Sequence, residues 1–379
     1  MENMSVVLDG MSDSPTGFEE ELTTVVLTNS TGYTNQTTAA TPAGVSSDLS
    51  GSELASVIIY WGIGILGLIG NTLVCVIFGL LKQRRSQVNL YILNQAFADL
   101  ATSFLLIAFG TTRVYKARMT TDGGFGEFLC RFWWSRFFLF SCFAVSAHNL
   151  TLMSVERYVA VVHPLQYGKL FTRRNTKISV LMVWLIAPIM QYIFVIFQHT
   201  VSKGRCATQP SWSPTAGTAA GVTLFVWEYF MPCLIMSYAY TTIVRTLQKK
   251  ERALAVSHRQ NSEAASTRGP SKGPQAGPQA RRRNVTVTLF TVFIVYVLCW
   301  TPNQFTFLQF NLGGTLNFDG PWYLITVIAA FVNSCSNPFV YALMHKQFQA
   351  GLKLLARCRK SNAVADSTHD RSINGTVLD

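Results

Sequence analysis

Several polar side chains that could do chemistry lie within long apolar runs of the chain. Asp99 lies near the middle of one run, and Asn71, Ser146 and the Asn and Ser residues of 333–337 lie in others. A carboxylate that is removed from water must find hydrogen-bond donors, bind a cation or become neutral. These residues are the partners that the other runs offer to Asp99, provided that the runs pack side by side.

A second candidate is the charged pair Glu156 and Arg157, at the end of the apolar run TLMSVERYVAVV. No opposite charge other than Glu156 lies nearby in the sequence to pair with the arginine. We therefore expect Glu156 to hold Arg157.

The elements that must position these residues are membrane-spanning helices. The 379 residues are 49% hydrophobic and 13% charged, against roughly 25% charged in soluble domains. A bilayer core about 30 Å thick takes roughly 20 apolar residues per helical crossing, and runs of this length are too long for barrel strands. The sequence predicts an all-α membrane protein, a bundle of seven transmembrane helices over residues 57–81, 88–112, 132–155, 178–197, 217–244, 285–310 and 322–344.

The distribution of basic residues predicts the orientation of the bundle. With the N-terminus outside, most of the 31 Lys and Arg residues face the cytoplasm, as the positive-inside rule requires. The net charge of +12 then reflects the basic loops on the cytoplasmic side of the membrane. A nucleic-acid partner is not expected, because the chain has no recognisable nucleic-acid module.

Segments outside the spans have distinct compositions. Residues 1–56 lack Lys and Arg and are rich in Thr, Ser, Gly and Asn, which predicts a disordered external tail. The Pro/Gly/Ser-rich part of 248–284 predicts a flexible loop. Residues 345–358 predict a short amphipathic eighth helix on the membrane lipids, and 359–379 a disordered cytoplasmic tail. The spans and their loops, 57–344, form the membrane domain.

Sites of covalent modification are predicted in the external and cytoplasmic segments. Glycosylation sequons lie in the tail at Asn3, Asn29 and Asn35. Cys130 and Cys206 are the cysteines on the external side, where oxidising conditions favour a disulfide between them. Cys358 is a candidate for palmitoylation, with a free cytosolic thiol as the alternative.

Every predicted span contains residues or short motifs that together form one pattern. They are Gly70–Asn71 in span one, Asp99 in span two, Glu156–Tyr158 and then His163–Leu165 after span three, Trp184 and Pro188 in span four, Pro232 and Tyr240 in span five, Cys299–Pro302 in span six, and Asn337–Tyr341 in span seven. Each is weak alone, but their joint order and depth resemble the rhodopsin-like class of G-protein-coupled receptors. The resemblance covers residues 56–359.

This resemblance implies a sodium site in the resting receptor. Its residues are Asp99, Ser146, Asn333, Ser334 and Asn337. A hard cation prefers oxygen ligands and would relieve the buried charge of Asp99. The alternative is a purely structural hydrogen-bond network, and no other cofactor is expected.

An activation switch and its partners are implied as well. The switch residues are Glu156, Arg157, Tyr158, Tyr240, Trp300, Pro302, Asn337, Pro338 and Tyr341. Trp300 is similar to the family's rotating aromatic residue, and Pro302 to the kink that lets span six swing outward. Arg157 is then freed for a heterotrimeric G protein. Receptor kinases and arrestin are the partners expected for the cytoplasmic tail.

Two departures from the family pattern leave points open. Cys130 precedes Arg157 by 27 residues, a longer interval than the family usually has, so the geometry of the disulfide is open. Span six begins with the basic residues of 281–283 and offers no acidic partner to Arg157. We therefore expect a weak lock on the resting state.

The outer half of the bundle supplies the ligand-binding candidates. They are Arg113, Arg136, Leu139, Glu228, Trp300, Asn303, Gln304, Phe307 and Phe331. Leu139 stands where aminergic receptors have Asp, and Phe331 where opsins have Lys, which argues against amine ligands and retinal. Both charge signs and amide groups favour a peptide, and CWTPNQ resembles neuropeptide receptors. Arg136 and Glu228 are alternatively an ion pair that holds the helices together.

The sequence thus predicts a plasma-membrane receptor that binds an extracellular neuropeptide and promotes nucleotide exchange on a G protein. A lipid or other non-amine small molecule is the alternative ligand. A small-solute transporter is disfavoured, because internal repeats are not evident. An enzyme is not expected, because no metal-ligand cluster or nucleophile–base set appears in the sequence.

Overall fold

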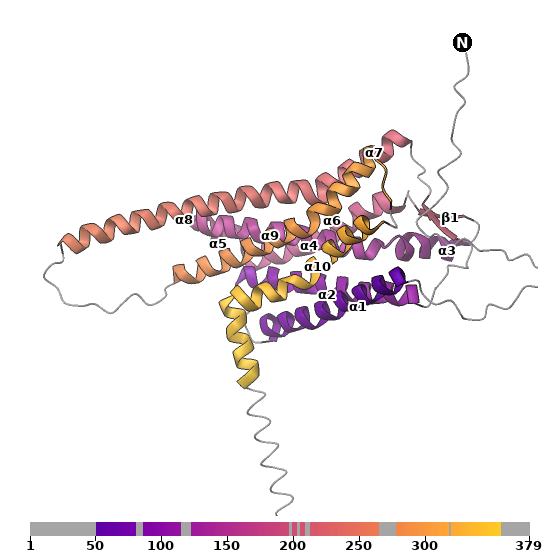
Figure 1. Cartoon of the computed structure of the whole chain (residues 1–379). Coiled ribbons are helices and arrows are strands. Elements are labelled where there is room, and N and C mark those ends of the chain that lie inside the picture. Colours follow the sequence, from indigo (N-terminus) through magenta and orange to yellow (C-terminus); the bar gives the residue numbers. More distant parts are fainter. Residues whose placement is uncertain are drawn as a thin grey trace, which may run out of the picture.

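The computed structural model describes residues 51–80, 86–114, 123–196, 199–202, 205–208, 213–264, 278–317 and 320–357. Long helices run side by side and form one bundle, with a two-stranded antiparallel hairpin at one end (Figure 1). The elements are α1 (Gly51–Cys75), η1 (Val76–Leu80), α2 (Gln87–Val114), α3 (Gly123–Leu129), η2 (Cys130–Trp134), α4 (Phe137–Val162), α5 (Pro164–Leu170), α6 (Arg173–Ile196), β1 (His199–Ser202), β2 (Arg205–Thr208), α7 (Pro214–Phe225), η3 (Val226–Phe230), α8 (Met231–Ala264), α9 (Pro278–Asn311) and α10 (Pro321–Met344). A last helix covers residues 346–357.

In the part of the chain that the structure describes, seven segments are long and apolar enough to cross a membrane, which confirms the predicted all-α fold. They are Leu54–Gly79, Gln87–Thr112, Gly123–Val162, Arg173–Ile193, Thr215–Ala253, Arg283–Asn311 and Pro321–Met344. Span three combines α3, the π-helical turn η2 and α4, and span five combines α7, the π-helical turn η3 and α8. The helix at 346–357 turns away from the bundle after α10, so the predicted short eighth helix is present (Figure 1).

The outside of the bundle is apolar, and its interior holds polar side chains within a largely apolar core. Phe97 and Leu298 are 60% and 68% exposed, whereas Asn71 and Asp99 are 0% and 1% exposed. This distribution suits a bilayer, because hydrocarbon offers no hydrogen-bond partners and polar groups must therefore pair with one another inside the bundle. The candidate polar residues therefore lie between helices.

Helices α8 and α9 extend into residues 248–284, for which the sequence predicted a flexible loop. α8 continues to Ala264 and α9 begins at Pro278. Each has 34 residues, a length of roughly 50 Å at about 1.5 Å per residue. The stretch QKKERALA consists of good helix formers, which explains the extension. Both helices are therefore longer than the roughly 30 Å core of a bilayer.

Span three is interrupted between Cys130 and Arg157, the interval that is longer than usual. Cys130 begins the π-helical turn η2, and Arg136 has a φ of 59°, in the left-handed region. Ser135 bridges the break, since its Oγ donates to the carbonyl of Arg131 at 2.5 Å and accepts from the N–H of Phe137 at 3.2 Å. A π turn holds an extra residue and a left-handed residue ends a helix. These irregularities absorb the extra length.

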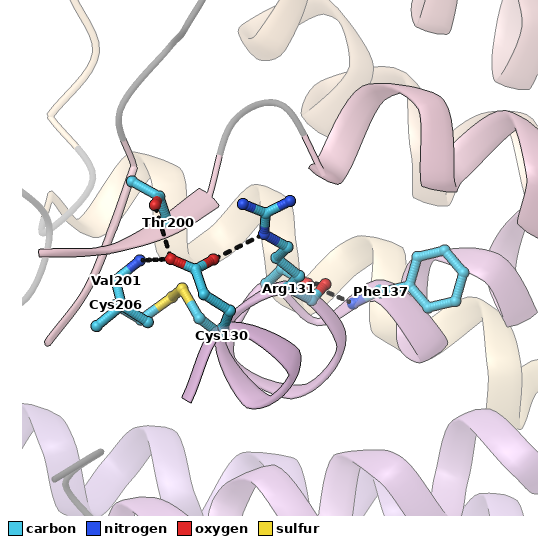
Figure 2. Close-up of a disulfide and its surroundings, with 8 residues drawn as sticks. Cys130, Arg131, Phe137, Thr200, Val201 and Cys206 are labelled. Atoms are coloured by element: carbon cyan, nitrogen blue, oxygen red, sulfur yellow. Dashed lines mark hydrogen bonds and ion pairs between the residues drawn. A yellow bond between two sulfur atoms is a disulfide. The ribbon is translucent and has the colours of Figure 1, made fainter. Parts of the chain in front are cut away.

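The hairpin β1–β2 is fastened to span three at two points. The predicted disulfide between Cys130 and Cys206 is confirmed, with their Cα atoms 5.2 Å apart. Glu127 Oε1 accepts from Thr200 Oγ1 and from the Val201 N–H, both at 3.0 Å. Figure 2 shows Thr200 and Val201 beside the disulfide, with Arg131 on the helix next to them. The hairpin is therefore held firmly over the outer end of the bundle.

Candidate functional site

Asp99 lies at the centre of a buried polar cluster between three spans. Its Oδ2 accepts from Asn337 Nδ2 at 2.8 Å, and its Oδ1 accepts from Ser146 Oγ at 3.3 Å. Gln95 Nε2 lies 3.3 Å from each carboxylate oxygen. The structure thus brings together Asp99, Ser146 and Asn337, three of the residues that the sequence grouped.

Among the described residues, the other two predicted members of this cluster, Ser334 and Asn333, form no hydrogen bond with Asp99. Ser334 Oγ donates to the carbonyl of Phe331 in its own helix at 2.8 Å. The backbone carbonyl of Ser334 accepts from Asn71 Nδ2 at 2.9 Å, which ties α1 to α10. Asn333 is buried, and its Oδ1 has no hydrogen-bond partner among the described residues; the same holds for Asn337 Oδ1.

The sequence reasoning assigned no role to Gln95. This residue precedes Asp99 by four positions, so both side chains lie on one face of α2. That spacing was the signal that could have identified it. Its amide nitrogen donates to Ser146 Oγ as well as to the carboxylate.

The oxygen atoms in this cluster suit a sodium ion in kind, but Gln95 does not. Hard cations take carboxylate, hydroxyl and amide oxygens, which Asp99, Ser146 and Asn333 carry. The group that faces the Asp99 and Ser146 oxygens is instead an N–H donor of Gln95. In this arrangement the residues therefore do not fit a resident ion, and the mechanism below uses none.

Trp300 lies beneath the outer half of the bundle, among aromatic rings. Its ring meets Phe143 edge-on at 5.0 Å between centroids, and Phe143 stacks on Phe331 at 5.6 Å. Tyr296 lies 6.3 Å from Trp300, one turn earlier in α9. Pro302 is inside α9, where it removes a backbone hydrogen bond just above this aromatic group.

In the outer half, Glu228 is the candidate with the clearest chemistry. It lies in the π-helical turn η3 of span five. Its Oε1 accepts a hydrogen bond from Gln191 Nε2 of α6, and its backbone carbonyl accepts from Tyr296 Oη at 3.0 Å. Among the described residues Glu228 forms no ion pair, so the alternative Arg136–Glu228 pair does not form.

The remaining ligand candidates occupy the same half of the bundle. Asn303 and Gln304 are nearly buried in α9, and Asn303 Nδ2 donates to Thr326 Oγ1 at 3.4 Å. Phe307 meets Tyr323 edge-on at 6.0 Å. Leu139 and Phe331 are buried. The side chain of Arg113 lies outside the described residues.

At the cytoplasmic end, Glu156 and Arg157 form a two-point ion pair through Arg157 Nε and Nη2. Both side chains are buried, at 0% and 7% exposed. Tyr167 Oη of α5 donates to Glu156 Oε1 at 2.6 Å, a contact that the sequence did not predict. Tyr158 turns outward instead and lies against His163.

Among the described residues the two switch tyrosines form no hydrogen bond with each other, since Tyr341 Oη is buried and has no partner. Tyr240 packs against Phe293 and Phe290 of α9, at 5.6 and 5.3 Å between centroids. Tyr341 packs against Phe348 at 6.3 Å. Pro338, in the same helix as Tyr341, lies so close to α1 that a Cβ at Gly70 would be 2.9 Å from its Cγ.

Asn284 near the start of α9 was also missed by the sequence reasoning. Its Nδ2 donates to the carbonyl of Met344 at 2.8 Å, and its Oδ1 accepts from the N–H of Lys346 at 3.1 Å. The same amide therefore forms hydrogen bonds with the backbone on both sides of the bend between α10 and the last helix. Arg283 beside it pairs with Glu251 of α8 at 3.0 Å.

Several predicted sites lie outside the described residues. They are the sequons Asn3, Asn29 and Asn35, and the candidate lipidation site Cys358. Their modification stays a prediction.

The chain is similar to known receptors over most of its length. The description "7 transmembrane receptor (rhodopsin family)" matches residues 70–341. The human histamine H2 receptor is 27% identical over 312 residues, 80% of this chain and 79% of that protein. Human galanin receptor type 1 is 27% identical over 331 residues, 84% and 87% of the two chains. Neuropeptide receptor 15 of Caenorhabditis elegans is 28% identical over 334 residues, 83% and 93%.

Proposed function

The chain belongs to the rhodopsin family of seven-transmembrane receptors and signals through G proteins, and we propose that its extracellular ligand is a neuropeptide with a cationic group. It is a receptor and not an enzyme. Its proposed location is the plasma membrane, with the hairpin end of the bundle outside.

The observation that carries the peptide proposal is the environment of Glu228. This carboxylate is half-buried between helices, and its side chain has one neutral donor, Gln191, among the described residues. A carboxylate that is removed from water without a nearby cation raises the free energy of the protein. A ligand that brings a cation lowers it again. A cationic side chain or amino terminus of a peptide would supply that cation.

Polar residues of α9 support the same proposal. Asn303 and Gln304 each carry an amide that can both donate and accept, as the backbone of a peptide requires. Two of the relatives named above are peptide receptors by their names. The ligand class of those relatives supports the proposal but does not decide it, because a histamine receptor is equally similar.

Contacts on the inner side of Glu228 suggest how binding reaches the switch. Tyr296 donates to the Glu228 backbone and lies against Trp300. In the proposed mechanism a ligand that engages Glu228 shifts this turn of η3 and moves Tyr296. Trp300 then repacks against Phe143, and α9 bends at Pro302.

At the cytoplasmic end, the proposed movement of α9 breaks few contacts. Asn284 leaves the bend after α10, and Arg283 leaves Glu251. Arg157 then separates from Glu156 and becomes available to the G protein. A ligand needs only to favour the open state over the closed state by a few kcal/mol.

A small cationic amine is the second candidate ligand. The observation that favours it is the same carboxylate, since Glu228 suits any ammonium group, and a histamine receptor is among the relatives. Leu139 argues against it, because an apolar residue stands where aminergic receptors have their aspartate.

The test is agonist-stimulated nucleotide exchange in membranes that contain the receptor and a promiscuous G protein. We expect a hit from a library of cationic neuropeptides and none from a panel of biogenic amines. The potency of that hit should fall in Glu228→Gln and recover partly in Glu228→Asp. Activation by an amine alone would replace the peptide proposal with the second candidate.

A further inference from the structure

The polar cluster around Asp99 contains a group that competes with a cation. We propose that the side-chain amide of Gln95 takes the place of a sodium ion between Asp99 and Ser146, which makes the resting receptor insensitive to sodium. The proposal is independent of the ligand class and rests on the contacts of Gln95.

The first step is the position of the amide nitrogen. Gln95 Nε2 is 3.3 Å from both carboxylate oxygens of Asp99 and donates to Ser146 Oγ. These three oxygens would be ligands of any ion at this point. Gln95, Asp99 and Ser146 are all at most 2% exposed, so the nitrogen is not displaced by bulk water.

The second step is the orientation of the amide, which a relay of hydrogen bonds fixes. Trp184 Nε1 donates to Asn94 Oδ1 at 2.8 Å, and Asn94 Nδ2 donates to Asn149 Oδ1 at 2.9 Å. Asn149 Nδ2 in turn donates to Gln95 Oε1 at 2.9 Å. An indole N–H can only donate, so it sets the direction of each amide after it. Gln95 must therefore present its nitrogen to Asp99.

The third step is the electrostatic consequence. The carboxylate of Asp99 receives the positive ends of two amide dipoles, from Gln95 and from Asn337. A cation at the same point would face the N–H groups of Gln95 and be repelled by them. To admit it, Gln95 would have to rotate, and Asn149 Nδ2 would then lose Gln95 Oε1 and keep only the Tyr91 carbonyl as an acceptor. Buried amides lose stability when one of their hydrogen bonds is left unmade.

Two further amide oxygens lie on one face of α10, on Asn333 and Asn337, and Asn337 Nδ2 bonds to Asp99. Asn333 Oδ1 and Asn337 Oδ1 are buried and have no partner among the described residues. They could complete a coordination shell with Asp99 and Ser146. Removal of the amide alone should therefore create a sodium site in this chain.

The experiment measures the thermal unfolding midpoint of the purified receptor in sodium chloride and in choline chloride at equal ionic strength. The wild-type midpoint should be the same in both salts. Gln95→Met, which keeps the length of the side chain but has no N–H, should gain a saturable rise in sodium of about 2–4 °C. The rise should disappear in the Gln95→Met/Asp99→Asn double variant.

A second variant keeps the test decisive if Gln95→Met folds poorly. Asn149→Ala removes the donor that orients Gln95 and should also give the receptor a rise in sodium, because the amide is then free to rotate. A wild-type rise as large as that of the variants would overturn the proposal. So would a folded, monodisperse Gln95→Met receptor with equal midpoints in the two salts.

Discussion

Two carboxylates lie between helices in the outer and central parts of the bundle, Glu228 half-buried and Asp99 fully buried, and their surroundings differ. Asp99 has side-chain donors from α2, α4 and α10. Glu228 has one side-chain donor among the described residues, Gln191 of α6. Buried polar groups contribute to stability when they are fully paired and are costly otherwise. Asp99 therefore belongs to the framework of the receptor, whereas Glu228 is the carboxylate that we propose for ligand binding.

The same comparison separates the helices of this framework from α9, the helix that we propose to move. The relay that ends at Asp99 runs through Trp184, Asn94, Asn149 and Gln95, on α2, α4 and α6. None of its members lies on α9. Glu228 instead contacts α9 through Tyr296. A ligand at Glu228 can thus shift α9 while the framework stays intact.

The largest effect on stability is expected from Asp99→Ala. This change leaves the amides of Gln95 and Asn337 and the hydroxyl of Ser146 without their shared acceptor, at a cost of about 3–5 kcal/mol in the free energy of unfolding. Denaturant unfolding of the purified receptor measures it. Glu228→Ala serves as the comparison and should cost about 1–2 kcal/mol, since one hydrogen bond from the Gln191 amide to the carboxylate is lost. Equal losses would remove the distinction between the two carboxylates.

The second prediction concerns ligand potency, for which a change at Glu228 should have a larger effect than a change at Asp99. Glu228→Gln should reduce the potency of a cationic agonist by roughly 30-fold or more, because loss of a buried charge partner costs about 2–5 kcal/mol. Concentration–response curves of nucleotide exchange measure it, with surface expression matched to the wild type. A change smaller than about 3-fold, below 1 kcal/mol, would place Glu228 outside the ligand site.

Particular residues show why the sequence predicted one part of this arrangement better than the other. The spans, the Cys130–Cys206 disulfide and the grouping of Asp99 with Ser146 depend on residue type and depth, which a sequence displays. The role of Gln95 depends on which face of α4 meets α2, and that is a property of packing. The π-helical turn η2 and the left-handed Arg136 compensate locally for the extra length of span three. The residue types at these positions do not predict such a backbone.

Asn284 illustrates the same limit and leads to the third prediction. Its two hydrogen bonds hold α9 to the bend after α10. Asn284→Ala should raise agonist-free nucleotide exchange by roughly 5- to 30-fold, since two neutral hydrogen bonds contribute about 1–2 kcal/mol to the closed state. Thr291→Ala is the control, because the Thr291 hydroxyl bonds within α9 and joins no other helix. Equal exchange in the two variants would contradict a holding role for Asn284.

The smallest effect is expected at the ion pair between Glu251 and Arg283, which also joins α8 to α9. Its side chains are 55% and 65% exposed, and exposed ion pairs contribute about 0–1 kcal/mol because water and salt screen them. Glu251→Gln should therefore change agonist-free exchange by about 2-fold or less at physiological salt, with any effect fading as salt rises. A larger and salt-resistant rise would mean that charge, and not the neutral amide of Asn284, holds α9 closed. The framework around Asp99 should unfold at the same denaturant concentration in either case, because neither residue touches it.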